Sequence, residues 1–172
     1  MKVILYITLS VNGCTSRENH DNSFISEEVL NNLTNLIRKT GNFIIGRNAY
    51  DLFVKKNKLF KKEDPRIFVL SRNTSLNSEN LRVNYINFSP KRIIEFIDEE
   101  DYASTVILGG SKTASLFLKE NLVDEIYINY EPLLLGKGNK FFCELPLEKR
   151  LEMISTNKIS NNTIQVHYKV LK

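Results

Sequence analysis

Short apolar segments alternate with amphipathic ones along most of the chain, and this alternation constrains the fold more than any other feature. Strand-like runs are expected at 2–10, 42–46, 66–71, 81–86, 105–108 and 124–130. Helices are expected between them, at 26–40, 49–56, 90–97 and 111–121. Because strands joined through crossover helices run parallel, this order predicts a parallel sheet that is covered on both faces.

The helix expected over residues 26–40 has the clearest pattern. Five apolar residues recur on one face at helical spacing, namely Val29, Leu30, Leu33, Leu36 and Ile37. Ser26 is the expected N-cap, and the acidic Glu27 and Glu28 suit the positive end of the helix dipole. Gly41 is expected to end the helix.

The later elements follow from shorter patterns. Leu81, Val83 and Tyr85 alternate with polar residues, which is typical of a strand. The helix at 111–121 is expected to pack inward through Ala114, Leu116, Phe117 and Leu118. The runs 151–158 and 163–171 meet at Asn161 and Asn162, so they predict a hairpin that makes the sheet mixed.

The length of 172 residues suits a single domain over 1–172, and a composition with 42% hydrophobic and 26% charged residues is that of an ordinary globular protein. The two cysteines and two histidines, Cys14, Cys143, His20 and His167, have no zinc-ligand or disulfide-framework spacing, so no metal site is expected. A reducing, cytoplasmic compartment fits this cysteine usage. No segment approaches the ~20 apolar residues of a membrane span, so no membrane association is expected.

A net charge of +4 raises the alternative of a nucleic-acid-binding module. The dense basic stretch is Lys55, Lys56, Lys58, Lys61 and Lys62, with Phe60 as its single aromatic residue. This pattern is more typical of a solvated helix end and loop. We therefore expect no nucleic-acid partner, and a mild positive field also suits a phosphorylated small molecule.

A glycine pair follows the buried strand at 105–108. Leu108 is followed by Gly109 and Gly110, and then by Ser111, Lys112 and Thr113 at the start of the next helix. Glycines let a backbone approach a ligand closely, and a helix start offers free N–H groups to a phosphate. A strand-to-helix turn can also need glycine for steric reasons alone, and the stretch is neither a Walker motif nor a GxGxxG fingerprint.

Two more strand ends carry groups that can bind phosphate. Gly46, Arg47 and Asn48 follow one strand, and the Arg47 guanidinium could fork onto phosphate oxygens or cap a neighbouring carbonyl. Ser71 and Arg72 follow the next strand, where they could hold the 2′-phosphate that distinguishes NADPH from NADH. Ligands of such sheets bind at the carboxyl ends of the strands, so the coincidence of three motifs there predicts a nucleotide site.

The order of these motifs resembles the dihydrofolate reductase-like superfamily. The resemblance covers essentially the whole chain through SVNG, SFIS, IIGRNAY, VLSR, VILGGSKTASLFL and LVDEIYINYEPLLLGKGNKFF. It is closer to the reductase domain of riboflavin-biosynthesis deaminase/reductase proteins, the RibD C-terminal domain, than to true dihydrofolate reductases. It implies a three-layer α/β/α fold, an NADPH-dependent reductase and a homodimer.

The resemblance also implies roles for individual residues. Gly46, Arg47 and Asn48 are expected at the cofactor phosphates, Ser71 and Arg72 at the adenosine 2′-phosphate, and the run from Gly109 and Gly110 through Ser111, Lys112 and Thr113 at the pyrophosphate. The Gly109–Gly110 peptide bond is expected to be cis, as in dihydrofolate reductases. Ser10, Asn12 and Leu108 are expected to face nicotinamide and substrate.

Two departures from the family pattern affect the substrate side. Asn12 stands where riboflavin-type reductases usually have Asp, and Leu108 stands where they usually have Glu. Asn can form hydrogen bonds but cannot carry a charge or relay a proton as Asp does. Pterin-reducing relatives use an acid on the first helix, and Glu27 and Glu28 are either that acid or simple partners of the helix dipole. No catalytic residue is assigned.

The leading hypothesis is hydride transfer from NADPH to a small heterocyclic or sugar-phosphate substrate, of which 5-amino-6-(5-phosphoribosylamino)uracil is the first candidate. A pterin reductase is the alternative within the same chemistry. A protein that binds the nucleotide without turnover is the alternative from another class.

Overall fold

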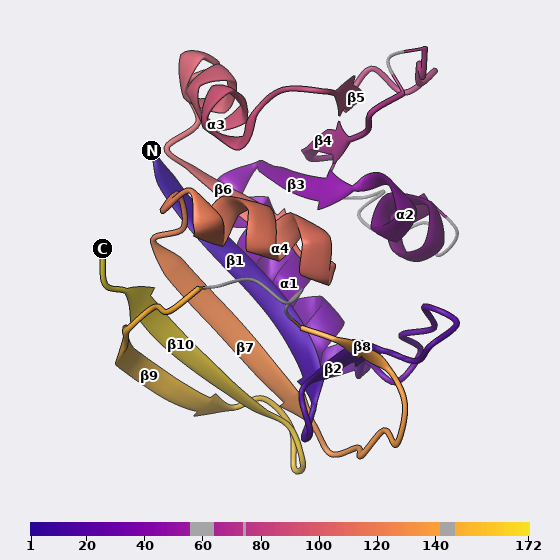
Figure 1. The fold of residues 1–172 in the computed structure, drawn as a ribbon, viewed down its shortest axis with the longest axis vertical. Helices are drawn as coiled ribbons and strands as arrows, with labels where there is room; N and C mark the ends of the chain where they lie inside the picture. Colours follow the sequence, from indigo (N-terminus) through magenta and orange to yellow (C-terminus); the bar gives the residue numbers. More distant parts are fainter. Residues whose placement is uncertain (56–63, 74, 142–146) are drawn as a thin grey trace.

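A mixed sheet forms the middle of the molecule in the computed structural model, which describes residues 1–55, 64–73, 75–141 and 147–172. Within these residues the sheet has eight strands in the order β5-β4-β3-β6-β1-β7-β10-β9 (Figure 1). The strands are β1 (Lys2–Ser10), β3 (Asn42–Gly46), β4 (Arg66–Leu70), β5 (Val83–Ile86), β6 (Ser104–Leu108), β7 (Glu125–Glu131), β9 (Leu151–Lys158) and β10 (Ile164–Val170).

The first six strands of that order, β5 through β7, pair in parallel, and β10 pairs antiparallel with both β7 and β9. The predicted parallel sheet with a closing hairpin is therefore present. A separate two-stranded antiparallel sheet joins β2 (Cys14–Ser16) to β8 (Asn139–Lys140). It connects the segments that follow β1 and β7 at the carboxyl end of the main sheet.

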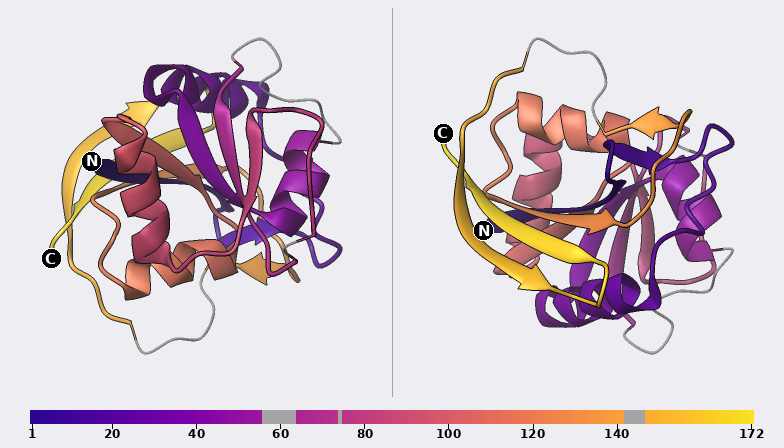
Figure 2. Two further views of the ribbon diagram at one scale, coloured as in Figure 1. Left: turned by 90° about the horizontal axis from the view of Figure 1, so that it is seen from above. Right: turned by 90° about the horizontal axis from the view of Figure 1, so that it is seen from below.

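Helices cover both faces of the sheet, so the expected three layers are confirmed (Figure 2). The helices are α1 (Glu27–Thr40), α2 (Arg47–Ala49), the π-helical turn η1 (Tyr50–Lys55), α3 (Pro90–Glu99) and α4 (Ser111–Lys119). One core lies between the sheet and α3 with α4, and the other lies between the sheet and α1 with η1. No helix among the described residues is long and apolar enough to cross a membrane.

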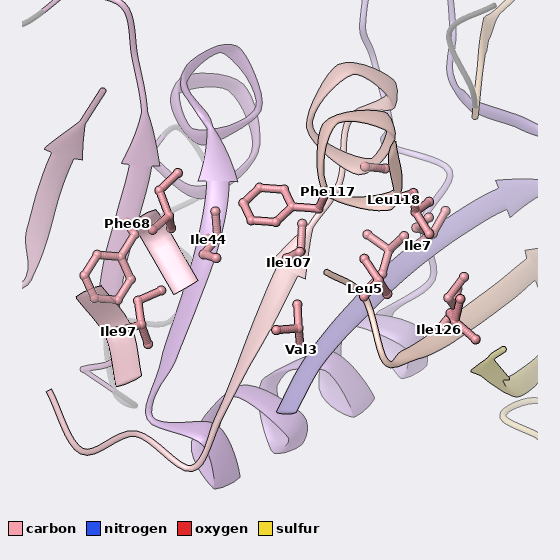
Figure 3. Close-up of a cluster of buried hydrophobic side chains, with 14 of the residues drawn as sticks. Val3, Leu5, Ile7, Ile44, Phe68, Ile97, Ile107, Phe117, Leu118 and Ile126 are labelled. Atoms are coloured by element: carbon pink, nitrogen blue, oxygen red, sulfur yellow. The ribbon is translucent and has the colours of Figure 1, made fainter. Parts of the chain in front are cut away.

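The alternation of side chains along the strands supplies both cores. On β1, Val3, Leu5 and Ile7 point into the core beneath α4, which also contains Phe117 and Leu118 (Figure 3). Tyr6 points into the core on the α1 side. Because both faces of this central strand are buried, β1 reads as a nearly continuous apolar run in the sequence.

The ends of α1 are set by different means. Gly41 adopts a left-handed conformation with φ of 69°, and its N–H donates to the Ile37 carbonyl at 2.8 Å, as expected for a helix stop. Ser26 is the N-cap residue of α1, as predicted, but its side chain makes no capping hydrogen bond. Its hydroxyl donates instead to Glu131 at the end of β7.

Leu81 is a correction to the predicted strand at 81–86. Its side chain is 88% exposed, and β5 begins only at Val83. The Asn80 side chain accepts from the Arg82 N–H at 2.9 Å, and the Asn80 carbonyl accepts from the Val83 N–H at 3.0 Å. This local turn takes Leu81 out of the alternation.

Two helix predictions also need correction. Leu116 is 41% exposed, because the buried face of α4 is formed by Thr113, Ala114, Phe117 and Leu118 at helical spacing. The short helix expected at 49–56 begins two residues earlier, at Arg47, and continues as the π-helical turn η1. The basic residues Lys56, Lys58, Lys61 and Lys62 lie outside the described residues, as does Cys143.

Candidate active site

The carboxyl ends of β3, β4 and β6 bring the three predicted loops to one edge of the sheet. Ile45 of β3 is aligned with Leu108 of β6, and Gly46 is aligned with Leu70 of β4. The residues after these strands are therefore neighbours across the sheet. In Figure 1 the arrow of β3 runs directly into α2 at this edge.

Gly46 and Gly109 permit a close approach between the strand ends and α4. A Cβ atom on Gly46 would lie 2.7 Å from Thr113 Oγ1, and one on Gly109 would lie 3.3 Å from Ala114 Cβ. Packing of the protein itself therefore disfavours a larger residue at both positions, strongly at Gly46 and more mildly at Gly109. This supports the steric explanation for these two positions.

Gly110 differs from them because its space is open. A Cβ atom built there would meet nothing within 4 Å, and the φ of this residue is −85°. Packing within the described structure therefore gives no reason for glycine at this position. The open space lies directly before the first turn of α4, so it can admit a ligand that touches the backbone.

The start of α4 is suited to an anion. Gly110 is its N-cap residue and supplies no side chain, and the first turn contains no acidic residue. The Ala114 N–H donates to the Gly110 carbonyl at 3.1 Å, which is the first bond of the helical ladder. The N–H groups of Ser111, Lys112 and Thr113 precede that bond and lie at the positive end of the helix dipole.

The peptide bond between Gly109 and Gly110 corrects one expectation. The described residues contain no cis peptide bond, so this bond is trans. The turn from β6 into α4 is made with an extended Gly110, whose ψ is 164°.

Two arginines stand at the same edge of the sheet. The side chain of Arg47 is 45% exposed, and its Nε lies 3.6 Å from Asp51 Oδ2 one turn along. Arg72 is exposed, and no ion pair joins it to another residue in the described part of the chain. Exposed guanidinium groups near an uncapped helix start make this edge attractive to phosphate.

The remaining cofactor candidates are polar and accessible. Asn48 and Lys112 are exposed at the starts of α2 and α4. The Ser71 hydroxyl accepts a bond from the Asn73 N–H at 3.1 Å, which shapes the loop after β4. The structure thus gathers all three motifs at one edge, and their contact with a cofactor stays a prediction.

A pocket opens on the α1 side of the sheet and reaches Gly109. It is lined by Tyr6, Thr8, Thr15, Asn22, Ile25, Val29, Leu30, Leu33, Ile45, Ala49, Leu108 and Gly109. The lining is apolar along α1 and carries neutral hydrogen-bonding groups from β1, β2 and the loop before α1. Of the residues in this lining, Tyr6 alone is ionisable.

The phenol of Tyr6 is held inside the protein. Its hydroxyl donates to the Val29 carbonyl at 3.1 Å, and Asn129 Oδ1 lies 3.5 Å away. Burial raises the pKa of Tyr6 well above its usual range, and this effect exceeds the opposing effect of bonds with Asn129 and Gln165. The pocket lining is therefore uncharged at neutral pH.

The predicted substrate residues are placed differently from one another. Leu108 lines the pocket, whereas Ser10 and Asn12 do not. The Ser10 hydroxyl is fully buried, donates to Asn12 Oδ1 at 2.9 Å and accepts from the Cys14 N–H at 3.0 Å. Their role at the substrate stays a prediction, but both side chains already have partners within the protein.

The acidic candidates on the first helix lie outside the pocket lining. Glu27 and Glu28 are exposed and are absent from its lining. Their location in the first turn of α1 fits the interpretation as partners of the helix dipole.

Sequence reasoning missed most of the pocket wall. Tyr6 and Thr8 could have been found, because they lie on the same face of β1 and carry polar groups in an apolar run. Thr15, Asn22 and Ile25 have no such pattern, since they reach the pocket through the path of the segment between β1 and α1, which includes the short strand β2. The buried carboxylate of Glu131 was also missed.

Comparison with known proteins gives consistent results. The model of the RibD C-terminal domain matches residues 1–165. A putative riboflavin biosynthesis protein from Shewanella sp. PV-4 superposes with a TM-score of 0.82 at 23% identity, and the match covers 100% of each chain. A diaminohydroxyphosphoribosylaminopyrimidine deaminase/5-amino-6-(5-phosphoribosylamino)uracil reductase from Thermotoga maritima superposes with a TM-score of 0.80 at 15% identity, over 99% of this chain and 56% of that one.

A true dihydrofolate reductase is also similar in structure. The enzyme from Enterococcus faecalis, complexed with NADP(H) and RAB-propyl, superposes with a TM-score of 0.71 at 18% identity, over 99% of this chain and 97% of that one. The expectation of a dihydrofolate reductase-like fold is therefore confirmed.

Proposed function

This chain belongs to the RibD C-terminal domain family, and on that premise we propose that it is an NADPH-dependent reductase of a small heterocyclic or sugar-phosphate substrate. The substrate class proposed first is that of the riboflavin-type reductases, the phosphoribosylaminopyrimidines. NADPH, when bound, supplies the hydride.

The observation that carries this proposal is the open space at Gly110, between the uncapped start of α4 and the pocket. Glycine there is unexplained by internal packing, whereas Gly46 and Gly109 are explained by it. A pyrophosphate against Gly110 would accept hydrogen bonds from the backbone N–H groups of Ser111, Lys112 and Thr113. The residues present thus fit the cofactor, with Arg47 and Arg72 as the outer phosphate ligands.

The pocket beside Gly109 would take the substrate ring. Its aliphatic wall on α1 can pack against a flat ring, and Thr8, Thr15 and Asn22 can bond to the polar edges of that ring. Leu108, Ile45 and the α1 side chains exclude water from the pocket. The pocket residues would therefore act by orienting the substrate ring against the cofactor and by shielding both from water.

The pocket favours a pyrimidine of the riboflavin type over a pterin. Pterin-reducing relatives use an acid on the first helix, but Glu27 and Glu28 do not line the pocket of this protein. A neutral lining suits a ring that binds without a charged partner. We therefore propose the pterin substrate only as the second candidate.

Replacement of Gly110 by alanine tests the cofactor site. The added Cβ meets no protein atom, so the melting temperature without ligand should stay at the wild-type value. NADPH should raise the melting temperature of wild type through mass action, and this rise should be smaller in Gly110→Ala. Gly136→Ala is the matched control, since a Cβ there also meets nothing within 4 Å. Equal NADPH responses in all three proteins would refute the placement.

Turnover is tested by the absorbance of reduced nicotinamide. Purified protein with NADPH should consume it in the presence of 5-amino-6-(5-phosphoribosylamino)uracil and not with dihydropterins. Consumption with dihydropterins alone would favour the second candidate. Stabilisation by NADPH with no consumption across both series would favour the nucleotide-binding alternative.

We propose, in addition, that two copies of the chain associate through β9. This strand lies at the edge of the sheet, and Leu151, Met153 and Ile154 are exposed on it. An exposed edge strand with apolar side chains is a ready partner for another strand. Light scattering should give the mass of a dimer for wild type and that of a monomer for Met153→Lys.

A further inference from the structure

Glu131 is a buried carboxylate whose hydrogen-bond partners in the described part of the chain are all neutral groups. It is the last residue of β7 and is only 2% exposed. Its Oε1 accepts from the backbone N–H and the hydroxyl of Ser26, both at 2.7 Å, and its Oε2 accepts from the Thr163 hydroxyl at 3.0 Å. None of the ion pairs between described residues includes Glu131.

Burial of a carboxylate without a cation is costly, so its three hydrogen bonds call for an explanation beyond general packing. The bonds connect segments that are far apart in the chain, because Ser26 precedes α1 and Thr163 precedes β10. Glu131 itself is aligned with Ser10 of β1. One side chain thus ties the start of α1 and the hairpin to the carboxyl end of β7.

The Ser26 side of this junction is part of the pocket wall. Ile25, directly before Ser26, lines the pocket, and Val29, Leu30 and Leu33 follow from the first two turns of α1. The N–H and the hydroxyl of Ser26 both donate to Glu131, and the hydroxyl makes no capping bond to the helix. The carboxylate therefore bonds the start of this wall to the carboxyl end of β7.

We propose that Glu131 is a positioning residue for the substrate pocket, which it serves by fixing Ser26 and with it the wall formed by Ile25 and the first turns of α1. The inference rests on the proposed function for its substrate. Glu131 does not line the pocket, so it acts through Ser26 and does not touch the reacting atoms. The proposed cofactor groups stand on α2, α4 and the loop after β4, whereas the hydrogen bonds of Glu131 within the described residues go to Ser26 and Thr163.

Three substitutions distinguish a positioning role of Glu131 from a general loss of stability. Glu131→Ala removes all three hydrogen bonds. Thr163→Val removes one bond to the same carboxylate while keeping the side-chain shape, so it serves as the matched control for lost stability on the hairpin side. Glu131→Gln keeps an acceptor for Ser26 and can donate to the Thr163 hydroxyl, so it should rescue the pocket.

The kinetic readout uses 5-amino-6-(5-phosphoribosylamino)uracil as the probe, with NADPH as the second ligand. Glu131→Ala should raise the substrate KM by about tenfold, as expected from the loss of hydrogen bonds to a charged group. The Kd for NADPH should stay at the wild-type value, because the cofactor groups lie on other elements. Thr163→Val and Glu131→Gln should keep the wild-type KM. An equal rise of KM in Glu131→Ala and Thr163→Val, or a parallel loss of NADPH affinity, would overturn the proposal.

Hydrogen exchange of the ligand-free proteins gives a readout that needs no turnover. Glu131→Ala should speed amide exchange across residues 25–33 and leave residues 111–119 unchanged, whereas Thr163→Val should leave both segments unchanged. If wild type turns over no candidate substrate, the proposed function fails, and the positioning role is then judged by exchange alone. Faster exchange confined to 25–33 supports that role, and unchanged or uniformly faster exchange overturns it.

Discussion

The side-chain amide of Asn12 and the backbone of Leu135 exchange two hydrogen bonds. Asn12 Nδ2 donates to the Leu135 carbonyl at 2.7 Å, and the Leu135 N–H donates to Asn12 Oδ1 at 3.1 Å. The amide uses its donor and its acceptor together, which a carboxylate cannot do because it has acceptors only. Asparagine in place of the Asp usual in riboflavin-type reductases therefore follows from this contact between two loops.

Asn12→Asp should destabilise the protein. The substitution loses the bond to the Leu135 carbonyl and places a negative charge beside that oxygen. The bond is exposed, so the free energy of unfolding, measured with urea at neutral pH, should fall by roughly 0.5–1.5 kcal/mol. Asn161→Asp in the exposed hairpin turn is the control and should change little. Equal urea midpoints for the two variants would show that the reciprocal bonds do not stabilise the fold.

Gly46→Ala should disturb the start of α4. The new Cβ would lie 2.7 Å from Thr113 Oγ1, so the strand end and the helix must move apart. Overpacking of this kind should lower the free energy of unfolding by about 1–3 kcal/mol and weaken NADPH binding. Thr113→Ala removes the clashing oxygen, so the double variant should be more stable than the sum of the single effects predicts. Strict additivity in thermal unfolding would contradict this account.

Arg72→Ala should reduce the preference for NADPH over NADH. An arginine bond to the 2′-phosphate contributes about 1.5–3 kcal/mol, which corresponds to roughly tenfold to a hundredfold in relative affinity. The ratio of the two dissociation constants, measured by calorimetry, should fall by this factor. Arg82→Ala is the control. Arg82 directly precedes β5 and pairs with Asp64, so it lies at the amino end of the parallel strands, whereas Arg72 follows the carboxyl end of β4. An unchanged ratio in Arg72→Ala would remove this residue from the site.

The sequence predicted what depends on local pattern. The buried run of β6 and the face of α1 that contains Leu33 and Ile37 follow from periodicity, and the loops with Gly46 and Gly110 follow from the rule that strand ends meet at one edge. The prediction that Leu81 belongs to a strand was wrong, because a turn formed by the Asn80 side chain interrupts the alternation of buried and exposed residues.

Contacts between distant segments could not be predicted in this way. Ser26 matches an N-cap pattern, yet its hydroxyl binds a carboxylate 105 residues away. Thr15 and Asn22 enter the pocket through a loop path that no periodicity encodes. The gathering of the three loops at one edge of the sheet was therefore foreseeable from the sequence, whereas the pocket wall and the junction at Glu131 required the packed structure.

The ion pairs of Glu125 predict how stability depends on pH. Lys2 Nζ lies 2.7 Å from Glu125 Oε1, and His167 Nε2 lies 3.0 Å from Glu125 Oε2. Burial alone would raise the pKa of Glu125, but the bonds and charges of Lys2 and His167 outweigh it and hold the pKa below its usual value of 4.5. A carboxyl group with a depressed pKa stabilises the folded state fully above its unfolded pKa, and this stabilisation is lost as the pH falls through the folded value.

Glu125→Gln should therefore flatten the acid side of the stability profile. The variant should be less stable than wild type at neutral pH, and the difference should shrink as the pH falls below about 4.5, because both proteins then carry a neutral group at this position. Urea unfolding measured at intervals from neutral to acid pH gives the two curves. Glu152→Gln, on the exposed strand β9, should run parallel to wild type throughout. A constant gap between Glu125→Gln and wild type down to the most acid pH would mean that the protonation of Glu125 is not linked to folding.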